Sequence, residues 1–119
     1  MKLRFHGNSL RLRLDQADVA RLAESGRLDE TVAFAPGQTL CYSIESSGTA
    51  ASVRASFEDG KIRVMLPSSD ARKWIEGDET GIESCSGPLR VIIEKDFKCL
   101  HRDGVEDAGG FPNPLAQKA

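Results

Sequence analysis

The stretch "KLRFHGNSLRLRL", residues 2–14, alternates apolar and basic side chains on both sides of a Gly-Asn dipeptide. Alternation with a period of two is typical of a half-buried β-strand, and Gly7-Asn8 tolerates the positive φ of a tight turn. The stretch therefore predicts a β-hairpin. One side of this hairpin would face the core, with Leu3, Phe5, Leu10, Leu12 and Leu14.

The same pattern recurs 52 positions later in "SVRASFEDGKIRVML", residues 52–66. Phe57, Ile62, Val64 and Leu66 take the places that Phe5, Leu10, Leu12 and Leu14 hold in the first stretch. Asp59-Gly60 belongs to the dipeptides most typical of a two-residue hairpin turn. The sequence therefore predicts a second hairpin and an internal repeat.

Each hairpin is followed by the pattern of a short helix. In residues 15–26, Asp15 is the expected N-cap, Asp18 completes a capping box and Gly26 ends the helix. In residues 67–78, the expected cap is Ser68 or Ser69 and the expected stop is Gly77. The apolar face of this second helix holds Trp74, whose periodicity favours a place in the core.

Four further strands are expected at residues 29–34, 39–45, 79–85 and 89–95. Both halves then read hairpin, helix, hairpin, as two ββαββ units over residues 1–46 and 51–97. The fold class predicted is α+β, a mostly antiparallel curved sheet or open barrel of about eight short strands, with two short helices. Residues 1–100 would form a single domain. Residues 101–119 would form an irregular tail, its last residues disordered.

Composition excludes several classes of protein. The chain has 119 residues, 39% hydrophobic and 29% charged, with a net charge of −2, which is typical of ordinary globular domains. The N-terminus lacks the apolar core of a signal peptide, and no apolar run is long enough to span a bilayer. These features favour a cytoplasmic location. No P-loop, GxGxxG, HExxH or GxSxG motif is present, so no cofactor is predicted.

Several motifs together resemble a known family. The opening "KLRFHGNSLRLRL", the middle "GDETGIE" (77–83), "EKDFKCLHR" (94–102) and "FPNP" (111–114) are similar to those of a family of short, uncharacterised bacterial proteins, a domain of unknown function. The resemblance runs over nearly the whole chain. It implies that the C-terminal motifs belong to the domain, and it carries no activity or catalytic residue.

A basic strand face is the first candidate site. Alternation places Arg4, Arg11 and Arg13 on one side of the first hairpin, and the repeat places Arg54 and Arg63 equivalently in the second. Such a face would favour phosphate or a nucleic-acid backbone. The alternative is a solvated strand face that guards against aggregation. The slightly acidic chain, with 6% aromatic residues, favours the solvated face, so a nucleic-acid partner is not expected.

A metal or nucleophile site is the second candidate. Cys99 and His101 are two positions apart, so in an extended segment both would point the same way. Cys41 and Cys85 are the other two cysteines. Strand geometry places Cys85 roughly 30 Å from Cys99, unless the tail folds back. The alternative is a structural role, in which Cys99 helps to seal one end of the core.

A protein interface is the third candidate. A sheet that does not close leaves edges that can accept a strand from a partner or from a second copy. Phe111, Pro112 and Pro114 would form a docking arm in the tail, although Phe111 can equally pack on its own domain. The sequence favours a small, non-enzymatic binding or accessory domain. The alternatives are a metal-dependent enzyme or sensor that uses Cys99 and His101, and a phosphate or nucleic-acid binder.

Overall fold

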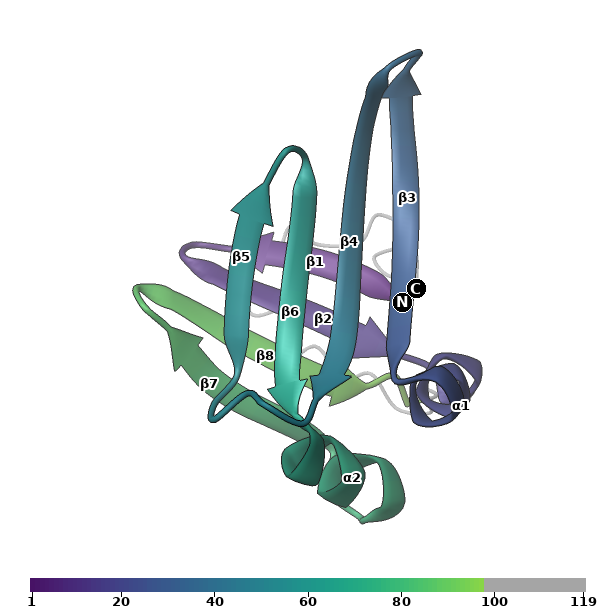
Figure 1. Cartoon of the computed structure of the whole chain (residues 1–119), viewed down its shortest axis with the longest axis vertical. Coiled ribbons are helices and arrows are strands. Elements are labelled where there is room, and N and C mark those ends of the chain that lie inside the picture. Colours follow the sequence, from purple (N-terminus) through teal and green to yellow (C-terminus); the bar gives the residue numbers. More distant parts are fainter. Residues whose placement is uncertain (98–119) are drawn as a thin grey trace, which may run out of the picture.

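The computed structural model describes residues 1–97, which form eight strands and two helices (Figure 1). The strands are β1 (Lys2–His6), β2 (Ser9–Leu14), β3 (Arg27–Ala35), β4 (Gln38–Ser47), β5 (Arg54–Glu58), β6 (Lys61–Pro67), β7 (Gly81–Ser86) and β8 (Leu89–Lys95). The helices are α1 (Gln16–Ser25) and α2 (Ser68–Glu76). The α+β class is confirmed.

The strands form two four-stranded sheets, which we call sheet A (order β1-β2-β8-β7) and sheet B (order β3-β4-β6-β5). The prediction of one curved sheet or open barrel is therefore wrong. Antiparallel pairing is confirmed in the four hairpins, but the central pairs β2–β8 and β4–β6 are parallel. Alternation in a sequence indicates which side of a strand is buried, and it is the same for either direction of the partner strand.

The repeat is present in the order of the elements, in an interleaved form. Each half of the chain contributes one hairpin to sheet A and one to sheet B, and its helix joins the two sheets. Exchanging the first half with the second converts the strand order of sheet A into that of sheet B. The two ββαββ units are thus not separate bodies, since each sheet needs strands from both halves.

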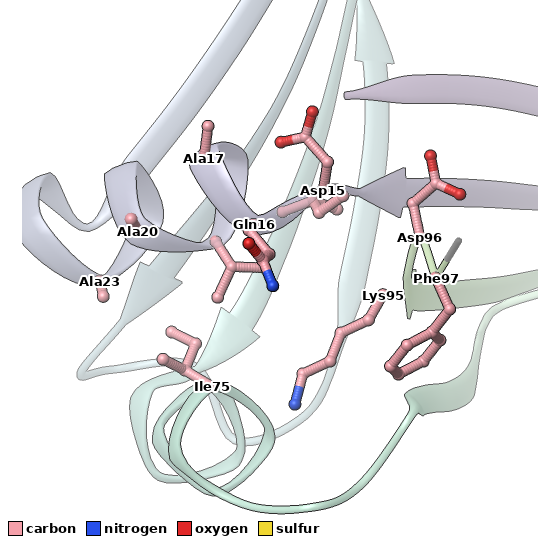
Figure 2. Close-up of a pocket in the computed structure, with 11 residues that line it drawn as sticks. Asp15, Gln16, Ala17, Ala20, Ala23, Ile75, Lys95, Asp96 and Phe97 are labelled. Atoms are coloured by element: carbon pink, nitrogen blue, oxygen red, sulfur yellow. The ribbon is translucent and has the colours of Figure 1, made fainter.

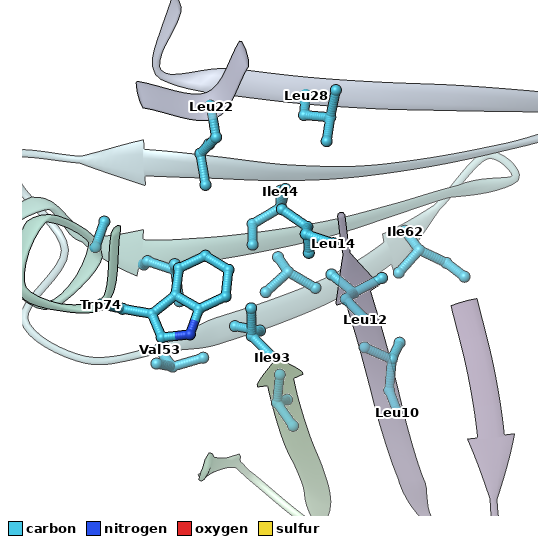
Figure 3. Close-up of a cluster of buried hydrophobic side chains, with 14 residues drawn as sticks. Leu10, Leu12, Leu14, Leu22, Leu28, Ile44, Val53, Ile62, Trp74 and Ile93 are labelled. Carbon is cyan, nitrogen blue, oxygen red and sulfur yellow. The ribbon is translucent and has the colours of Figure 1, made fainter. Parts of the chain in front are cut away.

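The core lies between the two sheets, whose strands run across one another (Figures 1 and 3). It takes the alternate apolar residues of the central strands, and both helices add to it. Trp74 of α2 is fully buried, as its periodicity predicts, and its indole Nε1 donates to the carbonyl of Thr80 at 3.3 Å. The buried cluster comprises Leu10, Leu12, Leu14, Leu22, Leu28, Ile44, Val53, Ile62, Val64, Leu66, Ala71, Trp74, Val91 and Ile93.

The helix ends follow the sequence in three of four cases. Asp15 caps α1 and forms the capping box with Asp18, and Gly26 ends the helix with a φ of 76°. Gly77 ends α2, but the predicted serine cap is wrong. The helix begins at Ser68, so the N-cap position falls on Pro67, which has no side-chain acceptor. Within residues 1–97, no helix is long and apolar enough to cross a membrane.

Candidate functional site

The predicted basic residues lie on two different surfaces. Leu10, Leu12 and Leu14 point into the core, so Arg11 and Arg13 between them point out from sheet A, on the side that Arg4 shares. By the same alternation, Arg54 and Arg63 point out from sheet B. Because the two sheets pack through their inner faces, these outer faces lie on opposite sides of the domain. The cations therefore do not share one surface.

Carboxylates of the neighbouring strands neutralise much of this charge. Arg13 donates to Oε1 of Glu94 through Nε at 3.0 Å and Nη2 at 2.8 Å, and Arg11 Nη1 reaches the same oxygen at 3.3 Å. Sheet B repeats the arrangement, because Arg63 Nη2 donates to Glu45 at 2.7 Å. An anion site that uses these arginines stays a prediction. Arg11, Arg13 and Arg63 would have to exchange an internal carboxylate for the ligand.

The other predicted site residues lie outside the described part of the chain. Cys99 and His101 of the metal prediction do, as do Phe111, Pro112 and Pro114 of the docking prediction. Among residues 1–97, no group of three or more His, Cys, Asp or Glu side chains is placed to hold a metal ion. Cys41 is half-buried and Cys85 is exposed, and neither forms a disulfide within residues 1–97.

An apolar pocket that the sequence analysis missed lies where hairpin ends of the two sheets meet. Its volume is about 430 Å³. The pocket is lined by Phe5, Leu10, Leu40, Ala55, Ser56, Phe57, Ile62 and Leu89. None of these side chains is ionisable. A pocket of this size and character can take an apolar group of a partner or ligand.

Six of the eight residues that line the apolar pocket come in pairs from the two halves of the chain. Phe5 and Phe57 are related by the repeat, as are Leu10 and Ile62. Leu40 and Leu89 also hold equivalent places, since each precedes the first residue of its strand that pairs with a central strand of the other half. The pocket is therefore a joint product of both halves.

The two phenylalanines stand at the rim of the pocket rather than in the core. Phe5 is 57% exposed and Phe57 is 68% exposed, although both belong to the apolar sides of their strands. They sit next to the hairpin turns, where the opposite sheet does not cover them. The sequence carries one signal of this placement, because each phenylalanine is the last apolar residue before its turn.

The β3–β4 hairpin continues this apolar surface. Pairing of β4 with β6 begins at Cys41, so the residues of β4 before it extend past β6 (Figure 1). Val32 pairs with Leu40 of the pocket wall, and Phe34 lies two residues further along β3, at the register shift between Ala33 and Ala35. Phe34 is 71% exposed. We call residues 32–40 the overhanging hairpin.

A second cavity lies between the two helices, with a volume of about 1010 Å³ (Figure 2). Ala17, Ala20 and Ala23 of α1 form one side, and Ile75 of α2 faces them. Lys95, Asp96 and Phe97 close the end from which the chain continues to residue 98. This helix cleft is thus placed beside the start of the C-terminal segment.

A polar cluster joins the start of the chain to α1 and to sheet B. The Met1 amino group lies 2.8 Å from Asp18 Oδ2 and 2.9 Å from Glu30 Oε2, and the hydroxyl of Tyr42 donates to the carbonyl of Met1 at 3.0 Å. Burial lowers the pKa of the amino group, but the hydrogen bonds and charges of Asp18 and Glu30 outweigh it, so this pKa is raised. Burial, together with Glu30, raises the pKa of Tyr42.

The geometry defines a class of protein: a two-sheet α+β domain with an apolar pocket built from both halves of an internal repeat. The family of unknown function DUF7009 matches residues 1–115, and the chain belongs to this family. The match confirms the family resemblance seen in the sequence. None of the curated proteins matches the chain.

Proposed function

We propose that this protein is a non-enzymatic binding module that docks a protein partner through the apolar pocket. The observation that carries the proposal is the pocket itself, walled by apolar side chains and flanked by the exposed rings of Phe5 and Phe57. Exposed aromatic side chains beside a pocket are typical of the centre of a protein interface.

The distribution of exposed apolar residues supports a docking surface in this region. Among residues 1–97, five large apolar side chains are exposed. Phe5 and Phe57 flank the pocket, Val32 and Phe34 lie on the overhanging hairpin, and Phe97 lies in the helix cleft. Single exposed apolar residues need no explanation, but a group of them around one pocket marks an interaction site.

The chemistry of the pocket favours a side chain of a partner over a charged metabolite. Its lining offers the hydroxyl of Ser56 and otherwise aliphatic and aromatic carbon. A charged ligand would lose its hydration there without gaining an opposite charge. An apolar or aromatic side chain loses no such hydration, and its burial contributes about 25 cal/mol for each Å² removed from water.

We place this module in the bacterial cytoplasm. The free thiols of Cys41 and Cys85 support a reducing compartment, and the family resemblance on which the sequence analysis relied supports a bacterial origin. A pocket lined mainly by aliphatic and aromatic side chains supports an accessory role, in which the domain contributes binding rather than catalysis.

Site-specific photocrosslinking in living cells tests the proposal. A benzophenone amino acid would replace Phe57, and the matched control would carry the same group in place of Phe97, which has a similar exposure but lies in the helix cleft. We expect a discrete protein adduct from position 57 that position 97 does not give. The adduct should weaken when Leu40→Ser opens the pocket wall. The absence of any adduct specific to position 57 would contradict the proposal.

A further inference from the structure

The overhanging hairpin presents an inner face that sheet A does not cover. Val32 and Leu40 belong to the same side of sheet B as the buried Ile44 and Val64. The exposed ring of Phe34 lies next to them, where the register of β3 with β4 shifts between Ala33 and Ala35. In the body of the domain, sheet A supplies the second layer over this side (Figures 1 and 3). Beyond the β5–β6 turn, no strand among residues 1–97 lies opposite this side of sheet B.

The sequence of the hairpin is as unusual as its position. From Thr31 to Ile44 the chain contains no Asp, Glu, Lys or Arg, although 29% of the whole chain is charged. Natural proteins commonly protect the edge strands of a sheet, of which β3 is one, with charged side chains, and lysine above all. Here that protection is absent, and the residues at the tip are Phe34, Ala35 and Pro36.

We propose that the missing layer is the overhanging hairpin of a second copy of this chain. In a two-fold dimer, the inner face of one overhanging hairpin would pack on that of the other, as the two sheets pack within the domain. Phe34 of each copy would then enter the apolar pocket of its partner, between Phe5 and Phe57. This inference rests on the proposed function, because it names the protein that docks in the pocket.

Self-complementarity favours a second copy over an unrelated partner. The chain carries both an apolar projection and, at its base, an apolar recess, and Leu40 belongs to both. A two-fold axis near Leu40 would place the projection of each copy in the recess of the other copy. The net charge of −2 gives two copies little mutual repulsion, and the contact region itself is uncharged.

The exposed rings supply part of the area that such a contact needs. At about 200 Å² for each buried ring, the exposed parts of Phe5, Phe34 and Phe57 offer roughly 400 Å² in each copy. A specific interface of standard size buries about 800 Å² in each partner. The three rings therefore supply about half, and the rest of the overhanging hairpin would have to supply the other half.

Light scattering and analytical ultracentrifugation of the full chain, over about 1 to 500 µM, provide the first test. We expect twice the monomer mass at high concentration. Phe34→Ser should weaken association by at least about 100-fold, because a symmetric dimer loses the ring twice. Phe97→Ser is the matched control and should leave the mass unchanged. Circular dichroism would verify that both variants remain folded.

Isotope-filtered NMR provides the second test, on an equal mixture of labelled and unlabelled chain. We expect intermolecular contacts from the ring of Phe34 to the side chains of Phe57 and Leu40. A chain that stays monomeric, or a dimer whose mass is insensitive to Phe34→Ser, would overturn the inference.

Photocrosslinking from position 57 separates this inference from the proposed function. An adduct between two copies supports both. An adduct with a different protein retains the docking function and overturns the dimer. Crosslinks to residues 98–119 of the same chain would show that its own C-terminal segment fills the pocket, and would overturn both.

Discussion

Replacing Glu94 by glutamine should destabilise the domain and expose the two arginines that this carboxylate holds. Glu94 Oε1 accepts three hydrogen bonds, two from Arg13 and one from Arg11. Glutamine keeps an acceptor oxygen of similar reach but removes the charge. The change therefore isolates the electrostatic part of the interaction.

The magnitude follows from the burial of the pair. Glu94 is 23% exposed and Arg13 is 29% exposed, so their charges are screened less than those of a surface ion pair. Charge-assisted hydrogen bonds are roughly twice as strong as neutral ones, which contribute about 1 kcal/mol net. We expect Glu94→Gln to lower the free energy of unfolding by about 1 to 2 kcal/mol. The melting temperature should fall by roughly 4 to 8 °C.

Urea unfolding of the two proteins measures this difference, and Glu83→Gln is the matched control. Glu83 accepts from Arg90 with the same two donor atoms, at 3.2 and 2.6 Å, but its side chain is 55% exposed. Its loss should cost less than about 0.5 kcal/mol. Equal effects of the two substitutions, or no effect of either, would refute the argument from burial. Stabilisation by inorganic phosphate should be greater in Glu94→Gln than in the unmodified chain.

Four further outcomes are expected. The free energy of unfolding should decline as the pH rises above 8.0, the ordinary pKa of the Met1 amino group. The pKa of this group is higher in the folded state, so its stabilising charge is lost as the pH rises through the folded-state pKa. Urea titrations across this range would measure the loss, and a free energy that does not change with pH would contradict the prediction. Gly77→Ala should lower the free energy of unfolding by about 2 kcal/mol in the same assay, because its Cβ would lie 2.5 Å from a carbonyl oxygen of α2. Gly48→Ala is the control and should lower it far less, because the space around Gly48 is open. Ser43→Ala should be neutral or stabilising by up to about 1 kcal/mol in thermal melts, since the buried hydroxyl has no hydrogen-bond partner among the described residues. A clear loss of stability would mean that the Ser43 hydroxyl forms a hydrogen bond. Phe57→Ser should lower stability by less than about 1 kcal/mol, because most of the ring is already exposed, and a greater loss would make the ring part of the core.

Local features of the fold were predictable because short-range physics determines them. Alternation identified the strands, the capping box identified the start of α1, and Asp59-Gly60 identified a hairpin turn, where both residues have positive φ. Each of these features depends on residues close together in the sequence. The buried sides of β2 and β6 followed from the same patterns.

The division into two sheets was not predictable from these patterns. It depends on the pairing of β2 with β8 and of β4 with β6, and the first of these joins residues about eighty positions apart. The same pairing brings Glu94 beside Arg11 and Arg13, so the sequence indicated a basic face without the carboxylate that neutralises it. Long-range pairing thus changed both the fold and the interpretation of the candidate anion site.

The apolar pocket forms because the opposite sheet covers only part of the length of each strand. Alternation continues to the last residue before each turn, whereas the opposite sheet ends sooner. Phe5 and Phe57 therefore have the sequence signature of core residues and the exposure of surface residues. A polar residue at either position would leave the buried part of each strand intact, so folding alone does not require a phenylalanine there. The binding function that we propose would give both rings a role that the stability of the domain does not require.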